Sequence, residues 1–274
     1  MLDPLTGTSA GGQARFPHPT RFADYSVMLL AIVIGGGSMI FFFWAGRPML
    51  VQMRFSPAGA LWWNAVLSLL FFTQHSVMIR RSVRGRLAAV VPARYDGAFY
   101  AITSGLVLTL VALLYQRVPA PPLFVLHGPS RLIVGVAGLL AVALTAWTIV
   151  ALRTFDPFGV RPIHEHLRKG RAASPDAIPF RAKAFVVRGP FRWVRHPLYS
   201  ALILLLWATP QMSLGRLEMA VLWTAWTLVA TLLEERDLVT DFGETYRHYC
   251  KQVPMLFPWR GPVRVQLNTG SKRG

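Results

Sequence analysis

Residues 192–210 read RWVRHPLYSALILLLWATP, and they combine two kinds of sequence that are rarely adjacent. The first half carries arginines, His196 and Pro197, whereas the second half is an apolar helix sequence with Tyr199 in its first turn. One interpretation is the ordinary basic flank of a membrane segment. The other is a polar site built where water meets lipid. The rest of the chain must decide between them.

The composition is that of a polytopic membrane protein. The 274 residues are 53% hydrophobic and 15% charged, with a mean hydropathy of +0.41, which lies outside the range of soluble domains. The net charge of +17 is spread between long apolar runs and is not gathered on a soluble core. We therefore predict that the protein contacts membrane lipid and binds no nucleic acid. Cys250 is the only cysteine, which excludes an internal disulfide and argues against a cysteine metal site.

The apolar segments predict an all-α membrane fold. Four segments free of charged residues are each about long enough to cross a bilayer. These segments are 25–44, 58–79, 98–115 and 132–152. Two shorter apolar segments, 198–210 and 217–233, follow and are separated by a short turn. We predict four spanning helices, then a tight C-terminal helical hairpin whose arms are short for a full crossing, then a cytoplasmic cofactor-binding segment.

The distribution of positive charge predicts the orientation. The loops 80–97 and 153–197 are rich in arginine and lysine, so the positive-inside rule places both of them in the cytoplasm. The N- and C-termini are then cytoplasmic too, in what we expect to be a bacterial inner membrane. We predict a loose N-terminal tail (1–24), a single membrane domain (25–260) and a flexible C-terminal tail (261–274).

A second informative stretch is 232–259, LLEERDLVTDFGETYRHYCKQVPMLFPW. In a helix, five of its residues would lie near one face because they are three or four positions apart: Glu235, Leu238, Phe242, Tyr246 and Tyr249. Glu234 and Glu235 follow an apolar run, and two adjacent carboxylates at a lipid boundary need a cation or a function. An acidic helix exit paired with Arg236 is an equally open explanation.

Together the two stretches resemble one family. The motif RHPxY at 195–199, followed by EExxLxxxFGxxYxxYxxxVP at 234–254, is similar to the integral-membrane methyltransferases related to isoprenylcysteine carboxyl methyltransferase and the phospholipid N-methyltransferases. The resemblance covers the C-terminal part of the chain, and the upstream helices match only as a hydropathy pattern. The matching residues are Arg195, His196, Pro197, Tyr199, Glu234, Glu235, Leu238, Phe242, Gly243, Tyr246, Tyr249, Val253, Pro254 and Pro258.

The resemblance implies an S-adenosylmethionine-dependent methyltransferase whose cofactor lies within 192–260. The implied cofactor-binding residues are Arg195, His196, Pro197, Tyr199, Glu234, Glu235, Leu238, Phe242, Tyr246 and Tyr249. Their chemistry suits the ligand, since a carboxylate can accept from its ammonium or ribose hydroxyls and a guanidinium can pair with its carboxylate. An aromatic face favours the sulfonium or the adenine.

Methyl transfer to an anionic acceptor needs alignment and exclusion of water more than acid–base chemistry. We therefore expect His196 and Arg195 to act in the catalytic site by positioning, with a general-base role for His196 as the alternative. We expect no metal. The tract His164-Glu165-His166 lies in a proline-rich stretch without a further ligand, so we interpret it as a solvated polar turn.

The upstream half bears on the acceptor. Gln74 and His75 lie in FFTQHSVMIRRS (71–82), and a polar pair in a spanning helix is a candidate substrate or catalytic site, although an interhelical hydrogen bond explains it equally well. This segment and TFDPFGVRPIHEH (154–166) resemble the methanethiol S-methyltransferase branch, with which NnrU-type proteins share a His-Ser. The resemblance implies conversion of methanethiol to dimethyl sulfide.

Other functions stay open at this point. A small apolar thiol can enter from lipid and is nucleophilic as its thiolate. Carboxyl methylation of a prenylcysteine and N-methylation of a phospholipid amine are alternatives within the same family. A haem-binding or solute-transporting protein, with His75 and His196 as axial ligands, is an alternative of another class.

Overall fold

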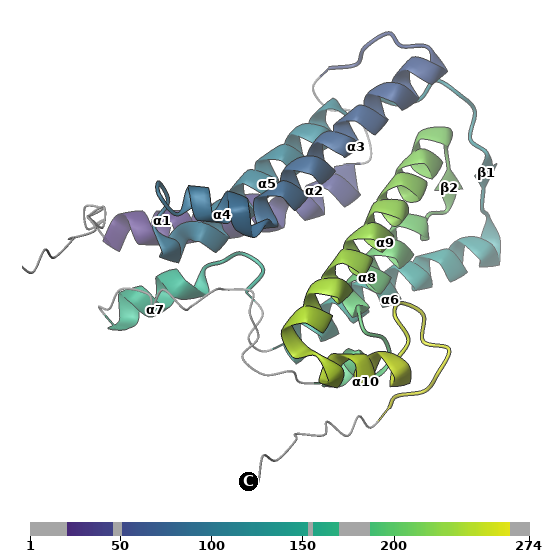
Figure 1. The fold of residues 1–274 in the computed structure, drawn as a ribbon. Coiled ribbons are helices and arrows are strands. Elements are labelled where there is room, and N and C mark those ends of the chain that lie inside the picture. Colours follow the sequence, from purple (N-terminus) through teal and green to yellow (C-terminus); the bar gives the residue numbers. More distant parts are fainter. Residues whose placement is uncertain (1–20, 46–50, 153–155, 170–186, 264–274) are drawn as a thin grey trace, which may run out of the picture.

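The computed structural model describes residues 21–45, 51–152, 156–169 and 187–263 (Figure 1). Most of both predicted tails, and the middle of the second basic loop, therefore lie outside the described residues. Within the described part the protein is almost entirely helical, as predicted. Apart from turns and loops, the exception there is one short antiparallel pair of strands, β1 (Phe124–Val125) and β2 (Gln211–Met212).

The first predicted span is one continuous helical run with a π-helical turn inside it. It consists of α1 (Arg21–Leu30), the π-helix η1 (Ala31–Gly36) and α2 (Gly37–Ala45). The π turn packs against Gly105 of α5 (Asp96–Leu114), where a Cβ atom would come within 2.6 Å of the Ile34 carbonyl oxygen. A larger residue at 105 would therefore push the two helices apart.

The next predicted spans coincide with helices. They are α3 (Pro57–Ile79), α5 and α6 (Gly128–Ala151), which begin and end within a few residues of the predicted limits. Ser56 caps α3 by accepting a hydrogen bond from the Gly59 amide. Between α3 and α5 lie α4 (Arg81–Leu87) and the 3-10 turn η2 (Ala93–Tyr95).

Four helical segments of the described chain are long and apolar enough to cross a membrane, so the protein is an integral membrane protein. They are 21–43, 93–114, 128–151 and 214–242. The number of candidate spans is four, as predicted, but the four segments are not all the predicted ones. The segment of α3 does not qualify, because Asn64, Gln74 and His75 interrupt its apolar sequence.

The last of the four segments is α9 (Leu214–Phe242), which corrects the prediction of a short arm ending at residue 233. This helix continues without a break through Glu234 and Glu235 for 29 residues in all. It follows the shorter α8 (Pro197–Trp207), which packs against both α9 and α6.

The helices form two groups that meet along α3 and α9 (Figure 1). One group contains α1 to α5 and the short α7 (Arg161–Lys169), and the other contains α6, α8, α9 and α10 (Glu244–Gln252). Aromatic rings join the groups: Trp223 stacks on Phe71 with 5.3 Å between ring centroids, and Trp226 stacks on Phe72 at 4.9 Å. This contact holds the C-terminal half against the N-terminal half.

The helix α7 contains His164, Glu165 and His166, which were predicted to lie in a polar turn. The prediction of a turn was wrong, because the tract is helical. Arg161 and Glu165 form an i,i+4 pair with 3.3 Å between Nε and Oε1, and such pairs stabilise a helix. In addition, Ile163 gives the helix a fully buried anchor against α1 and η2.

Candidate active site

The site begins at the N-terminus of α8. Pro197 is the first helical residue, where its missing N–H needs no partner. His196 directly precedes the helix and is buried, with a side chain that is 5% exposed. The helix start therefore fixes Arg195 and His196 side by side at the end of an apolar element.

The structure brings the two conspicuous sequence motifs into direct contact. The Arg195 Nε donates to the Glu235 Oε1 at 2.7 Å, and the His196 Nε2 lies 3.1 Å from the same oxygen. The side chains of Arg195 and Glu235 are 11% and 17% exposed, so the pair is largely removed from water. Burial alone would lower the pKa of Arg195, but the hydrogen bond and charge of Glu235 raise it above its ordinary value.

Arg195 also holds the C-terminal segment. Its NH1 donates to the carbonyl oxygens of Cys250 and Val253 at 3.0 and 2.6 Å. These acceptors belong to the backbone, so the sequence motif could not reveal them. A single guanidinium thus connects α9 with the end of α10 and the residues that follow it.

Backbone hydrogen bonds continue this connection. The amides of Arg195 and His196 donate to the carbonyls of Pro254 and Met255 at 2.8 and 3.1 Å. One turn into α8, the Ser200 hydroxyl lies 2.7 Å from the Leu256 carbonyl. The segment 253–256 therefore runs alongside the start of α8 and covers it.

The predicted aromatic face is divided between two helices. Glu235, Leu238 and Phe242 lie on α9, whereas Tyr246 and Tyr249 lie on α10. The break occurs at Gly243, whose φ of +57° is a conformation that favours glycine. The prediction of one continuous helix was therefore wrong. Four of the five residues still pack in one cluster, and Glu235 lies beside it.

Tyr249 anchors α10 to the stretch before α8. Its side chain is 2% exposed, and its hydroxyl donates to the Phe191 carbonyl at 2.6 Å. Burial raises the pKa of this phenol, which keeps it neutral as a hydrogen-bond donor. Its contact with the backbone makes Tyr249 a structural member of the site.

Tyr199 and Glu234 lie on the other side of His196. The Tyr199 ring is stacked on the imidazole, with 5.6 Å between centroids and 11° between planes. The Glu234 Oε2 is 3.8 Å from the His196 Nδ1, and its side chain remains 46% exposed. Of the two adjacent carboxylates, Glu234 is thus the more accessible one.

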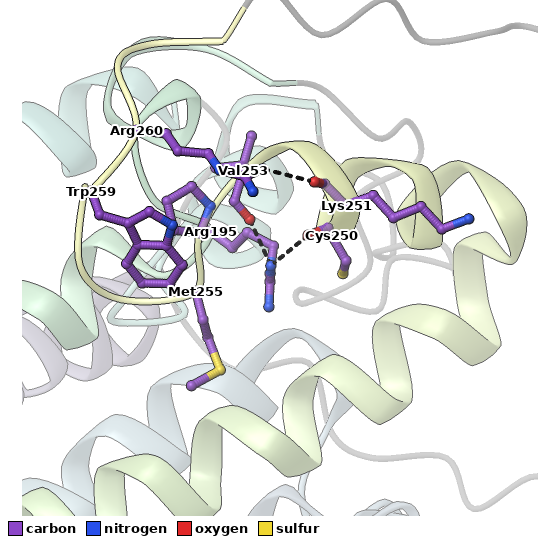
Figure 2. Close-up of a pocket in the computed structure, with 8 residues that line it drawn as sticks. Arg195, Cys250, Lys251, Val253, Met255, Trp259 and Arg260 are labelled. Atoms are coloured by element: carbon purple, nitrogen blue, oxygen red, sulfur yellow. Dashed lines mark hydrogen bonds between the residues drawn. The ribbon is translucent and has the colours of Figure 1, made fainter.

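A pocket of about 280 Å³ adjoins this cluster (Figure 2). It shares Arg195 with the ion pair, and the remaining lining comes from the segment 250–260. Figure 2 shows Met255 and Trp259 beside Arg195, while the Lys251 side chain points away. The sequence motifs pointed to Arg195 but not to Trp259 or Arg260.

The second predicted polar site lies between α3 and α5. Tyr100 and Ser104, one turn apart on α5, contact the His75 ring. The Tyr100 hydroxyl is 2.9 Å from Nε2 and 3.1 Å from Nδ1, and the Ser104 hydroxyl is 3.3 Å from Nδ1. Gln74 points elsewhere, with its amide nitrogen 2.8 Å from the Met78 sulfur. The structure therefore separates the two predicted substrate residues, and it adds two hydroxyl groups.

Sequence reasoning missed Tyr100 and Ser104 as site residues. A signal was available, because polar residues spaced i,i+4 mark one face of an otherwise apolar helix. Among the residues that the structure describes, no group of three His, Cys, Asp or Glu side chains is placed to hold a metal ion.

Comparisons with known proteins identify the family. The family model described as NnrU protein matches residues 65–247. The methanethiol S-methyltransferase of Pseudomonas deceptionensis is 37% identical over 218 residues, which are 78% of this chain and 76% of that protein. Methanethiol S-methyltransferase 1 of Bradyrhizobium diazoefficiens is 33% identical over 214 residues, covering 76% and 70%.

A further relative is the methanethiol S-methyltransferase of Mycobacterium tuberculosis, 31% identical over 196 residues, which are 72% of this chain and 77% of that protein. No solved structure matches this chain. The matched region includes His75, Arg195 and the paired carboxylates, so it contains both polar clusters. The chain belongs to the NnrU family, in its methanethiol S-methyltransferase branch.

Proposed function

We propose that this protein is an S-adenosylmethionine-dependent membrane methyltransferase that converts methanethiol to dimethyl sulfide. The observation that carries the proposal is the contact of Arg195 and His196 with Glu235 at the end of an apolar helix. Its relatives are named for transfer of a methyl group to methanethiol. The helical, membrane-embedded character of the chain suits an acceptor that dissolves in lipid.

The residues at the site fit the proposed cofactor chemically. S-adenosylmethionine offers an ammonium, a sulfonium, a carboxylate, a ribose and an adenine. Glu234 supplies an accessible carboxylate for a cationic group, and Tyr199 supplies a ring beside it. In the adjoining pocket, Trp259 offers an aromatic surface and Arg260 a cation.

We assign different tasks to the two carboxylates. Glu235 is occupied by Arg195 and His196 and is mostly buried, so its task is to hold the site together. Glu234 is nearly half exposed and 3.8 Å from the His196 ring, so it is available to the ammonium or the ribose of the cofactor. The sequence left both carboxylates as candidates for binding the cofactor, and their different exposure supports this assignment.

The proposed chemistry is an in-line displacement. When bound, the cofactor supplies an activated methyl group on a sulfonium. The sulfur of the acceptor forms a new carbon–sulfur bond as the bond to the sulfonium breaks, and the acceptor proton passes to a base. His75 is our choice for this base, because His196 is held against a carboxylate that orients it.

The polar contacts at one end of the helix bundle support the predicted orientation. Near the start of α1, the buried Asp24 accepts from the Tyr95 hydroxyl and lies 3.4 Å from the Arg94 Nε. The N-terminus of α1 and the basic loop 80–97 are therefore on the same side, which we propose to be cytoplasmic. An alkaline phosphatase fusion at residue 120 should be active if the next loop is outside, and a fusion at residue 90 should not.

Binding and turnover together test this proposal. Calorimetry on detergent-purified protein should show S-adenosylmethionine binding, and headspace chromatography should show dimethyl sulfide from methanethiol. Binding without dimethyl sulfide would retain the methyltransferase and reject the thiol, so that a prenylcysteine and a phospholipid amine become the acceptors to test. Well-folded protein that does not bind the cofactor would reject the enzyme class, and a visible absorption spectrum would then test the haem alternative.

A further inference from the structure

The polar cluster between α3 and α5 contains groups to which the proposed function gives no task. Tyr100 and Ser104 both contact the His75 imidazole, and the Phe71 ring lies beside it with 5.1 Å between centroids. Three polar side chains at a contact between apolar helices are costly unless they serve packing or function. A hydrogen bond to join two helices would need only two of them.

The polar cluster also lies next to α9, the helix that carries Glu234. The Phe71 ring beside His75 stacks on Trp223 of α9, with 5.3 Å between ring centroids. The two polar clusters, which are distant in sequence, therefore involve helices that pack against each other.

We propose that Tyr100 binds the acceptor thiol and relays its proton to His75. The inference rests on the proposed function and adds the acceptor subsite to it. With the Nδ1–H of His75 donating to the Ser104 hydroxyl, Nε2 is left to accept from Tyr100 at 2.9 Å. The thiol S–H then donates to the Tyr100 oxygen.

Each proton that moves in this step has a named donor and a named acceptor. As the thiol sulfur forms its bond to the methyl carbon, its proton moves to the Tyr100 oxygen and the Tyr100 proton moves to the His75 Nε2. The electron pair of the broken methyl–sulfonium bond stays on the donor sulfur, which becomes a neutral thioether. The resulting imidazolium loses its proton to solvent before the next turnover. Ser104 acts as a positioning residue, because its hydroxyl contacts Nδ1 and, by accepting from that nitrogen, would keep the proton there and leave Nε2 free to accept.

The test compares Tyr100→Phe with the matched control Tyr115→Phe. Tyr115 follows the same helix at its opposite end, where its hydroxyl lies 3.1 Å from the Gly215 carbonyl. We expect Tyr100→Phe to lower kcat/KM for methanethiol by at least about tenfold while S-adenosylmethionine affinity stays unchanged. Tyr115→Phe should turn over as the wild type does. The defect should shrink as the pH rises, since an acceptor that ionises in solution no longer needs the relay.

Ser104→Ala keeps the inference testable if Tyr100→Phe does not fold. It removes one hydroxyl from the His75 ring, so kcat should fall without loss of cofactor binding. Normal turnover in both variants, or a defect in Tyr100→Phe that is equal at all pH values and accompanied by weaker cofactor binding, would overturn the relay. A wild type that makes no dimethyl sulfide overturns the proposed function, and the relay with it.

Discussion

Arg195 and Glu235 form a largely buried ion pair, with 2.7 Å between the Nε and Oε1 atoms and 40 positions between them in sequence. The pair connects the start of α8 to the cytoplasmic end that we propose for α9. Because Arg195 also donates to two backbone carbonyls of the C-terminal segment, the pair is the centre of a network. Loss of either charge should therefore affect both stability and binding.

The two adjacent carboxylates should respond differently to neutralisation. Glu235→Gln leaves the Arg195 guanidinium buried without its counter-charge, which should lower the free energy of unfolding by about 3 kcal/mol. Glu234→Gln changes a side chain that is 46% exposed, so stability should stay within about 0.5 kcal/mol. Both variants should bind S-adenosylmethionine more weakly.

Thermal unfolding in detergent and calorimetry separate these effects. The Glu234→Gln variant is the control for stability, because it makes the same substitution one residue away. Equal melting temperatures for the two variants would show that Glu235 has no greater structural role than Glu234. Undiminished cofactor binding by Glu234→Gln would contradict the task that we assign to Glu234.

Tyr249→Phe should loosen the C-terminal cover of the site. The substitution removes a 2.6 Å hydrogen bond to the Phe191 carbonyl and leaves that partly buried acceptor without this donor, at a cost of about 1 kcal/mol. The ring remains, so the packing of Tyr246 and Val253 against it is retained. We expect a lower melting temperature and faster proteolysis after residue 250. Tyr95→Phe, at the Asp24 contact in the other helix group, should lower stability without faster cleavage there.

The sequence predicted the apolar helices well because their limits depend on local composition. Uncharged stretches near 58–79, 98–115 and 132–152 became α3, α5 and α6. The limit at residue 233 failed for a physical reason, since glutamates are good helix formers and do not end a helix. Gly243 ends it instead, in a backbone conformation that suits glycine.

The site was predicted in part. The spacing of the two motifs identified Arg195, His196 and Glu235, which do meet. The carbonyls of Cys250 and Val253 could not be found, because every residue has a carbonyl and only the fold selects which ones Arg195 reaches. Tyr100 was also missed. Its i,i+4 spacing from Ser104 marks a polar face on α5, but spacing within one helix does not show that His75 of another helix is the partner.

Gly105→Ala should destabilise the contact between α5 and the π turn. An added Cβ would lie 2.6 Å from the Ile34 carbonyl oxygen, which belongs to backbone and cannot turn aside. Such overpacking typically costs about 1 to 3 kcal/mol. Gly135→Ala is the matched control, because this helical glycine has no atoms within 4 Å of the added Cβ among the residues described. Its higher helix propensity should keep or raise the melting temperature. Equal melting temperatures for the two variants would contradict the close approach.

Cys250 provides a chemical reporter for the site. Cys250 lies on α10, is one of the residues that line the pocket beside Arg195, and carries the only thiol in the chain. Burial raises the pKa of this thiol, while the Arg195 charge lowers it. Because alkylation requires the thiolate, a raised pKa means less thiolate at a given pH and slower labelling.

We therefore expect the iodoacetamide reaction of the folded protein to have its midpoint at a higher pH than that of the SDS-denatured protein. Removing the guanidinium in Arg195→Ala should move the midpoint of the folded protein higher still, because the charge that favours the thiolate is lost. S-adenosylmethionine should slow labelling in the wild type by occupying the pocket. A midpoint below that of the denatured protein would mean that Arg195 outweighs burial. Labelling unaffected by saturating cofactor would place the cofactor away from α10, and with it the site that Arg195 and Glu235 organise.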